Sequence, residues 1–153
     1  MDHQIRGTGY GEPMTSSWVR DLLDGSAAPP PAATLLGFDL RAFDTEAMSI
    51  EVGFTAKDEF VNAIGHVQGG MLCAMLDSTL GSAVVATLVE GEWAPTTDLH
   101  TQFHAPAVPG LIIGRGRVTR RGRTIAFAAG ELVDADDRLI ASAVATSAIR
   151  SGR

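Results

Sequence analysis

The chain contains a single cysteine, Cys73, so it cannot form a disulfide within itself and carries no cysteine pattern typical of an oxidising compartment. It is also poor in positive charge, because 12 lysine and arginine residues stand against 18 aspartate and glutamate residues, a formal net charge of -6. We therefore exclude nucleic acid and anionic membrane surfaces as main partners. Residues 1–18 lack the apolar segment of a signal peptide or membrane span, so we expect a cytoplasmic protein.

The 153 residues, of which 45% are hydrophobic, supply enough apolar material for one domain with a substantial core. We expect this domain at residues 34–150. Residues 1–33 are expected to precede it as a polar tail, a short helix and a proline-rich connector.

The short helix begins near Ser16 and Ser17, which are good N-cap residues, and its apolar stripe ends before Gly25. Three consecutive prolines follow at 29–31. Because proline has no N–H to donate and cannot continue a helix, the segment 27–33 is predicted to be a stiff connector.

Alternating hydrophobicity predicts the clearest strand over residues 47–54, where apolar side chains occupy every second position. The preceding segment, 37–43, is expected to pair with it as a hairpin. Further along the chain, glycine, proline and acidic turns separate four more extended segments: residues 96–104, 111–121, 124–133 and 139–150.

Residues 71–89 are apolar on nearly every face and long enough for four to five helical turns, which is typical of a helix surrounded by protein. The expected order of elements is ββαββββ. One long buried helix among strands indicates an antiparallel sheet curled around that helix. The sequence thus predicts an α+β protein with the hotdog fold and a short N-terminal helix.

Two glycines, Gly69 and Gly70, lie directly before the long helix. Glycine lets a ligand approach the backbone closely, and the first helical turn offers unpaired N–H groups at the positive end of the helix dipole. An oxyanion could bind there. A glycine pair alone, however, is more often only a tight turn into a helix.

Asp77 is the feature that favours function over an ordinary turn. It is an acidic residue in a helix that is otherwise almost entirely apolar, and a carboxylate in such surroundings usually has a partner or a task. The alternative is a structural aspartate held by a hydrogen-bond donor such as a sheet threonine.

Gly70 and Asp77 are seven residues apart, so they share one helix face but lie about 10 Å apart along the axis. One aspartate side chain cannot span that distance. If both groups act on one carbonyl, Asp77 must come from a second chain whose helix runs antiparallel to the first. The site then requires a homodimer.

Several of these residues carry a resemblance: Asn62, Gly65, Gly69, Gly70 and Asp77, followed by segment 96–110 and the turn 120–124. Over residues 37–149 the chain resembles the PaaI-like branch of the hotdog-fold acyl-CoA thioesterases, within the 4-hydroxybenzoyl-CoA thioesterase superfamily. That family's pattern is Asn, two residues, Gly, two residues, His-Gly-Gly, and an acidic residue seven positions after the last glycine.

The resemblance implies that the backbone N–H of Gly69 polarises a thioester carbonyl, while Asp77 of the partner subunit acts as general base or nucleophile. Asn62 would place the water or support the loop, and Thr96 would orient water near the carboxylate. Coenzyme A would enter as part of the substrate, and no separate cofactor is expected. Dimers that pair into a homotetramer are also expected.

One position departs from the family pattern, because Gln68 stands where histidine is usual and His66 lies two residues earlier. Glutamine keeps a donor but cannot titrate. Since the oxyanion contact is made by backbone, we expect Gln68 to alter loop support or substrate orientation, and His66 to contact the substrate.

Arginines cluster near the end of one predicted strand in a protein that is otherwise acidic, and Arg120, Arg121 and Arg123 are candidates for the phosphates of coenzyme A. The alternative is a solvated strand face. No metal is expected, because His100 and His104 on one strand would stand about 13 Å apart.

Hydrolysis of an acyl-CoA thioester is the function favoured by these residues. A non-catalytic acyl-thioester-binding module is the alternative, against which Asp77 argues, and a hotdog dehydratase is disfavoured because it would need a differently placed catalytic histidine. The acyl group stays open among aryl, phenylacetyl and medium-chain groups, as do the pathway and the choice between dimer and tetramer.

Overall fold

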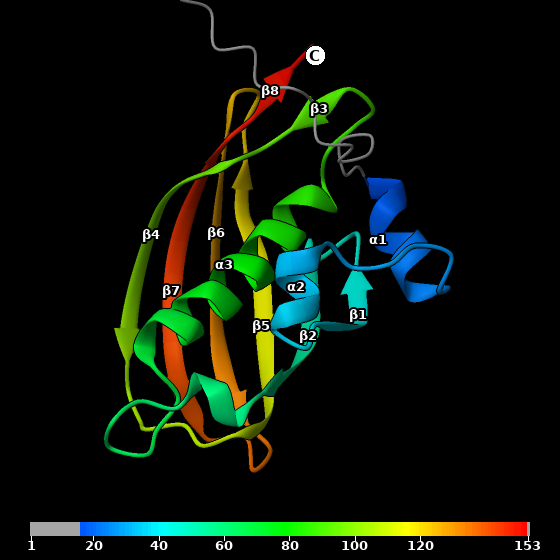
Figure 1. Cartoon of the computed structure of the whole chain (residues 1–153). Helices are drawn as coiled ribbons and strands as arrows, with labels where there is room; N and C mark the ends of the chain where they lie inside the picture. Colours follow the sequence, from blue (N-terminus) through cyan, green and yellow to red (C-terminus); the bar gives the residue numbers. More distant parts are fainter. Residues whose placement is uncertain (1–15, 153) are drawn as a thin grey trace, which may run out of the picture.

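The structure, a computed structural model, describes residues 16–152 of the chain, so the predicted tail at 1–13 lies outside the described residues. Its centre is one antiparallel sheet across which the longest helix, α3 (Gly69–Val85), lies (Figure 1). In spatial order the strands are β1 (Asp39–Asp44), β2 (Ser49–Ala56), β5 (Gly110–Arg121), β6 (Ile125–Asp134), β7 (Leu139–Ala148) and β4 (Thr96–Phe103). The predicted hotdog fold is confirmed.

The core lies between α3 and the sheet. From the helix come Met75, Leu76 and Leu80, each at most 1% exposed, and from the sheet come Phe54 and Leu132, both fully buried. Burying one such side chain contributes about 1.5–3 kcal/mol, so this layer is the main source of stability.

Glycines in the sheet let α3 approach it closely. A Cβ added to Gly114 would lie 2.3 Å from the Thr79 hydroxyl oxygen, and one added to Gly130 would lie 2.8 Å from a Leu80 methyl group. Gly116 is also close to Thr79, because its added Cβ would lie 3.1 Å from the Thr79 methyl group. The sheet therefore has a shallow trough of glycine backbone in which the helix is seated.

The N-terminal region agrees with expectation at the first helix and departs from it at the connector. Helix α1 (Ser16–Leu23) is followed by Gly25 in the left-handed region at φ +78°. A second helix, α2 (Pro31–Leu35), begins inside the segment predicted to be a connector. The prediction was therefore wrong for residues 31–33. Proline at the first turn is compatible with a helix because its missing N–H has no intrahelical partner in any case.

Short elements at the periphery were not predicted: the 3₁₀ turn η1 (Asp58–Phe60) and the two-stranded sheet of β3 (Glu92–Trp93) and β8 (Arg150–Ser151). Helix α3 also begins two residues earlier and ends four residues sooner than expected. Beyond Val85 the N–H groups of Thr87 and Leu88 bond to carbonyls three residues back, which closes the helix with a tighter turn.

The two edges of the main sheet differ. β1 lies beside α1 (Figure 1), whereas β4 pairs only with β7 and its outer edge meets no strand within the described chain. Eight residues of β4 therefore present a row of unpaired backbone groups. Within residues 16–152 no helix combines the length and apolar character needed to cross a membrane.

Candidate active site

The loop that enters α3 is closed by Asn62. Its side-chain oxygen accepts hydrogen bonds from the N–H groups of Ile64 (3.0 Å) and His66 (3.2 Å), and its own N–H donates to the His66 carbonyl at 2.7 Å. Gly65 turns the loop with φ +88°, a region that favours glycine. Asn62 thus supports the loop, one of the two roles expected of it.

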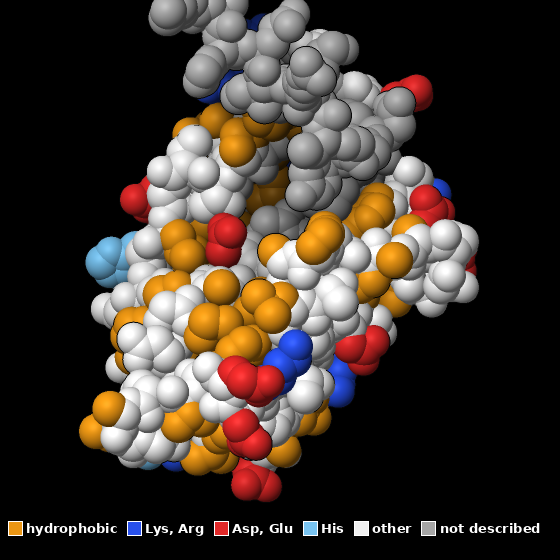
Figure 2. All heavy atoms as spheres, in the orientation of Figure 1, with side chains coloured by type: hydrophobic (Ala, Val, Ile, Leu, Met, Phe, Trp, Pro, Cys, Tyr) orange, Lys and Arg blue, Asp and Glu red, His pale blue; other side chains and the backbone are white. Residues whose placement is uncertain are grey.

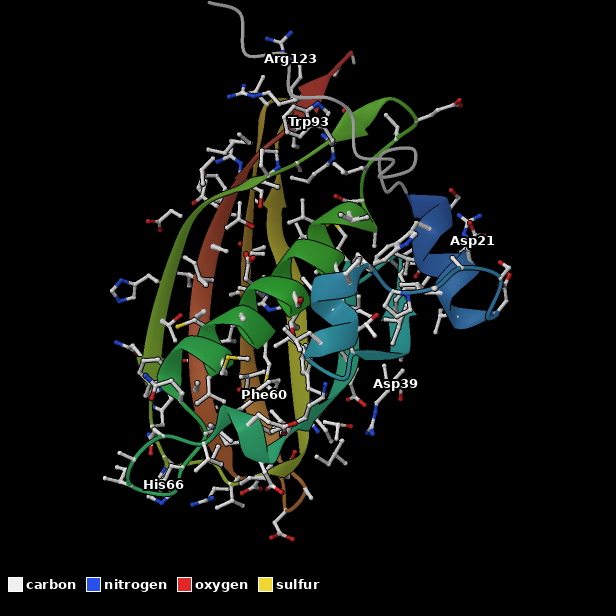
Figure 3. All side chains as sticks on the ribbon, viewed as in Figure 1. Asp21, Asp39, Phe60, His66, Trp93 and Arg123 are labelled. Atoms are coloured by element: carbon white, nitrogen blue, oxygen red, sulfur yellow. The ribbon has the colours of Figure 1, made fainter. Side chains whose placement is uncertain are left out.

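The loop, the start of α3 and the end of β4 border an open hollow of about 360 Å³. It contains three of the predicted site residues, Asn62, His66 and Gly69, and Figure 3 shows His66 at this end of the molecule. The other lining residues are Val67, Leu72, Phe103, His104, Ala105, Pro106 and Ala107. Sequence-distant segments therefore meet where the glycine pair predicted an anion site.

The first turn of α3 offers its N–H groups to this hollow. Gln68 holds the N-cap position and its carbonyl accepts the N–H groups of Met71 and Leu72, but its side chain makes no capping bond. Among the described residues the N–H groups of Gly69 and Gly70 have no acceptor. Unpaired donors at the positive end of a helix dipole attract an oxyanion.

Asp77 is placed differently from expectation. Its side chain is exposed, so the prediction that α3 is wrapped by protein on every face is wrong for the single chain. Among residues 16–152 the carboxylate has neither a hydrogen bond nor an ion pair, which argues against a structural aspartate held by a sheet threonine. The chain leaves this carboxylate available for another molecule.

The exposed face of α3 is built from small residues. Gly70, Cys73, Asp77 and Gly81 follow one another at helical spacing and are exposed or half-buried. A Cβ added to Gly70 or Gly81 would meet nothing within 4 Å, so the chain's own packing gives no reason for glycine at either position. Figure 2 shows apolar side chains gathered on the side of the molecule that carries α3.

Thr96 and the predicted arginines lie at the opposite end of the domain. Thr96 begins β4, about 23 Å along the strand from Phe103 at 3.3 Å per residue. In Figure 3 Arg123 lies at one end of the molecule and His66 at the other. One chain therefore does not bring these residues to the hollow at Gly69.

Arg121 is engaged within its own chain. Its guanidinium pairs with Glu92, and its other nitrogens donate to the carbonyls of Gly122 (2.6 Å) and Thr87 (3.4 Å). Partial burial works to raise the pKa of Glu92, but the Val89 N–H and the Arg121 guanidinium outweigh it and hold this pKa below its ordinary value. Arg121 thus fastens the segment after α3 to the end of β5.

A larger hollow of about 930 Å³ lies across the face of the sheet that points away from α3. It contains none of the predicted site residues, and charges of both signs line it, including Glu51 and Arg115. Size alone does not identify the reactive site. Among the described residues no three histidine, cysteine, aspartate or glutamate side chains gather closely enough to hold a metal ion.

Two side chains of the smaller hollow, Phe103 and His104, are among those that the sequence interpretation missed. Phe103 ends β4 with its ring tip against Gly69, and His104 follows it with its Nε2 hydrogen-bonded to the Ser142 hydroxyl at 2.8 Å. The sequence did contain a signal for Phe103. It is an aromatic residue at the end of a polar strand, three residues before Pro106.

Comparisons with known proteins show the family and the fold of the chain. The profile of the Thioesterase superfamily matches residues 64–141. A crystal structure from Ralstonia eutropha JMP134, described as an inferred thioesterase and a phenylacetic acid degradation-related protein, matches with a TM-score of 0.81 and 44% identity. The match covers 85% of this chain and 98% of that one.

Two further proteins are more distant in sequence. An inferred esterase from Saccharolobus solfataricus is 29% identical over 106 residues, which are 69% of this chain and 75% of that protein. The PaaI protein from the E. coli phenylacetic acid degradation operon matches with a TM-score of 0.77 and 19% identity, over 90% of this chain and 96% of its own. The second likeness shows the fold alone.

Proposed function

The chain belongs to the thioesterase superfamily, and on that premise we propose that it hydrolyses an acyl-CoA thioester to a free acid and coenzyme A, at a site shared by two copies. The observation that carries the proposal is a pair of unpaired groups on one face of α3. The N–H groups of Gly69 and Gly70 have no acceptor among the described residues, and the exposed carboxylate of Asp77 has no donor.

A two-fold axis would bring these groups together. If two α3 helices run antiparallel, the start of one lies beside the middle of the other, and Asp77 of the second copy faces Gly70 of the first. The far end of the second copy then also approaches the hollow, with Thr96 and with Arg120 and Arg123, which have no ion pair among residues 16–152. Each site would take its loop and oxyanion donors from one chain and its carboxylate from the other.

Two features of the single chain support this pairing. Gly81 in the middle of a helix destabilises it by about 1 kcal/mol relative to alanine, and close approach of another helix would explain its presence. The edge strand β4 lies beside α3 (Figure 1), so a second copy could cover both its unpaired edge and the exposed face of the helix.

In the proposed reaction the thioester oxygen lies at the N–H of Gly69. Addition to the carbonyl carbon places negative charge on that oxygen, which a preorganised donor stabilises by about 3–4 kcal/mol. Asp77 either takes the proton from an attacking water or attacks directly to give an anhydride that water then opens. In both routes the C–S bond breaks and the coenzyme A thiolate leaves and takes up a proton.

Thiol release by Asp77→Asn tests the proposal. We expect kcat/KM for acyl-CoA to fall at least about a hundredfold with an unchanged melting temperature, because this exposed side chain stabilises nothing in its own chain. The matched control is Asp39→Asn, which changes an exposed aspartate at the start of β1, the edge strand farthest from β4. Equal turnover by Asp77→Asn and wild type would refute the role of Asp77.

Cross-linking tests the register of the two helices. If Gly70 faces Asp77 of the second copy, the two-fold axis passes between Cys73 and Ala74, so the two Cys73 side chains lie close together. We expect mild oxidation or a short bismaleimide to give a covalent dimer. A Cys73→Ser chain carrying Ser26→Cys, an exposed loop position, should give none. A dimer in solution that resists cross-linking at Cys73 would rule out this register.

A further inference from the structure

The loop that enters α3 is hydrogen-bonded to the segment that follows β4. The N–H of Val67 donates to the Ala107 carbonyl at 2.9 Å, and both residues are buried, at 4% and 2% exposure. Val67 lies two residues before Gly69, whose N–H has no acceptor among residues 16–152. The position of that N–H therefore depends on where residues 105–107 lie.

The segment after β4 is also held by Arg138, which belongs to the turn between β6 and β7. Arg138 Nη2 donates to the Pro106 carbonyl at 3.1 Å, and Arg138 Nε donates to the Asp134 carboxylate at 2.9 Å. Figure 1 shows this turn at the same end of the molecule as the loop that enters α3. Arg138 thus connects a turn of the sheet to the segment against which the loop rests.

The Asp134 carboxylate determines where the guanidinium of Arg138 lies. Its Oδ1 accepts the N–H groups of Asp136 and Arg138, at 3.0 and 2.9 Å, and its Oδ2 accepts Arg138 Nε. Hydrogen bonds from the side chain and backbone of Arg138 hold the pKa of Asp134 below its ordinary value, so this carboxylate is ionised at neutral pH. Because a guanidinium is a planar fork, the nitrogen held at Asp134 directs another nitrogen to Pro106.

We propose that Arg138 is a positioning residue for the Gly69 N–H, acting through Pro106 and Ala107 on the loop before α3. The inference rests on the proposed thioester hydrolysis. Arg138 is not among the residues that line the smaller hollow, so it does not touch a group bound there in its own chain. A donor stabilises an oxyanion only at the right distance, and a displacement of about 1 Å can lower a rate about a hundredfold.

Steady-state kinetics test this role. The substrate is whichever of benzoyl-, phenylacetyl- and hexanoyl-CoA the wild type hydrolyses fastest. Arg138→Gln should lower kcat about tenfold and leave KM within about twofold, because the displaced donor matters most in the transition state. The melting temperature should stay nearly unchanged, since the Arg138 side chain is 53% exposed. Arg138→Lys keeps the charge but not the planar fork, so it should resemble Arg138→Gln.

Arg115→Gln is the matched control. Arg115 pairs with Asp137 of the same turn at 2.7 Å, but it makes no hydrogen bond with residues 104–107 in the described part of the chain. Its kcat should stay within about twofold of the wild type. An unchanged kcat in Arg138→Gln, full activity in Arg138→Lys, or an equal loss in Arg115→Gln would overturn the proposal.

Two inhibitors separate positioning of the donor from a general loss of structure. S-trifluoroacetonyl-CoA forms a tetrahedral hydrate that resembles the reaction intermediate, whereas the ketone of S-acetonyl-CoA stays trigonal. Arg138→Gln should weaken binding of the first inhibitor about tenfold and of the second less than about twofold. Equal weakening of both inhibitors would mean that Arg138 has only a structural role, and would contradict the proposal.

Amide hydrogen exchange tests the intermediate step without turnover. Exchange at the Val67 N–H should be at least about threefold faster in Arg138→Gln than in the wild type, and unchanged in Arg115→Gln. Unchanged exchange in Arg138→Gln would exclude the route through residues 106 and 107. That outcome is distinct from failure of the proposed function, which would appear as a wild type without thiol release or as a fully active Asp77→Asn.

Discussion

The two ends of helix α3 use their polar groups in opposite ways. After its C-terminal end, Arg121 and Glu92 pair with each other and with nearby backbone, and the strands β3 and β8 close over the segment. At its N-terminal end the N–H groups of Gly69 and Gly70 have no acceptor among the described residues. Both ends carry groups capable of binding an anion, but Arg121 is engaged within its own chain, whereas the glycine N–H groups are available.

The comparison teaches how to separate structural from functional polar residues in this chain. Arg121 satisfies its donors internally, which accounts for its presence without a ligand. Asp77 and the glycine N–H groups are left unsatisfied at exposed or hollow positions, where water or a substrate can reach them. Substitutions at the N-terminal end of α3 and on its exposed face should therefore affect association and turnover. Substitutions at the C-terminal end, called here the paired end because Arg121 and Glu92 pair there, should affect stability.

The largest effect is expected at Gly81. Gly81→Leu places a bulky side chain on the exposed face of α3, at a position where an added Cβ meets nothing within 4 Å in its own chain. If the site is shared by two copies as proposed, this variant should be monomeric at concentrations where the wild type dimerises. It should also lose thiol release at least about a hundredfold, because each site then lacks its second chain. Sedimentation and activity measured at the same concentrations check this.

Glu90→Leu is the matched control for Gly81→Leu, since it adds the same side chain at an exposed position just beyond α3. It should stay dimeric and active. A Gly81→Leu protein that is both dimeric and active would show that a second helix does not approach this face.

A moderate effect on stability alone is expected at the paired end. Arg121→Gln removes the partner of the half-buried Glu92 and two donors to backbone carbonyls, so the free energy of unfolding should fall by about 1–2 kcal/mol. Arg117→Gln, an exposed arginine of the same strand, should change it by less than about 0.5 kcal/mol. Urea unfolding measures both, and equal values would contradict a fastening role for Arg121.

The smallest effect is a pH dependence at Glu92. The pKa of this carboxyl is lower in the folded chain than its ordinary value of 4.5, so the ionised form stabilises the fold. That stability is present above the unfolded pKa and is lost as the pH falls through the folded pKa. The difference in unfolding free energy between wild type and Glu92→Gln should therefore shrink between about pH 6 and pH 3. A constant difference would exclude the ionic contribution.

Local patterns in the sequence predicted the strands and the helix well. Strand β2 alternates in the sequence, and Ile50, Val52 and Phe54 all point into the core. The glycine pair marked the start of α3 to within two residues, because the helix begins at Gly69 itself. These features depend on neighbouring residues, which a single sequence displays directly.

Features that depend on distant segments were not predictable in this way. The partner of Arg121 lies 29 positions away in a two-residue strand without any periodic signal. The exposure of Asp77 depends on how far six strands reach around the helix, and nothing in the helix sequence states that limit. The ring of Phe103 meets Gly69 only because the end of β4 returns to the start of α3.

The trough of Gly114, Gly116 and Gly130 bears on how this protein can be altered. A side chain at Gly114 or Gly130 would collide with α3 or with neighbouring backbone and push the helix away from the sheet. Gly69 and Asp77 both lie on α3, so both would be displaced together. In the proposed mechanism, substitution of these remote glycines would therefore lower thiol release as much as a change of Asp77, and distance from the reacting atoms is a poor guide to which mutations are harmless.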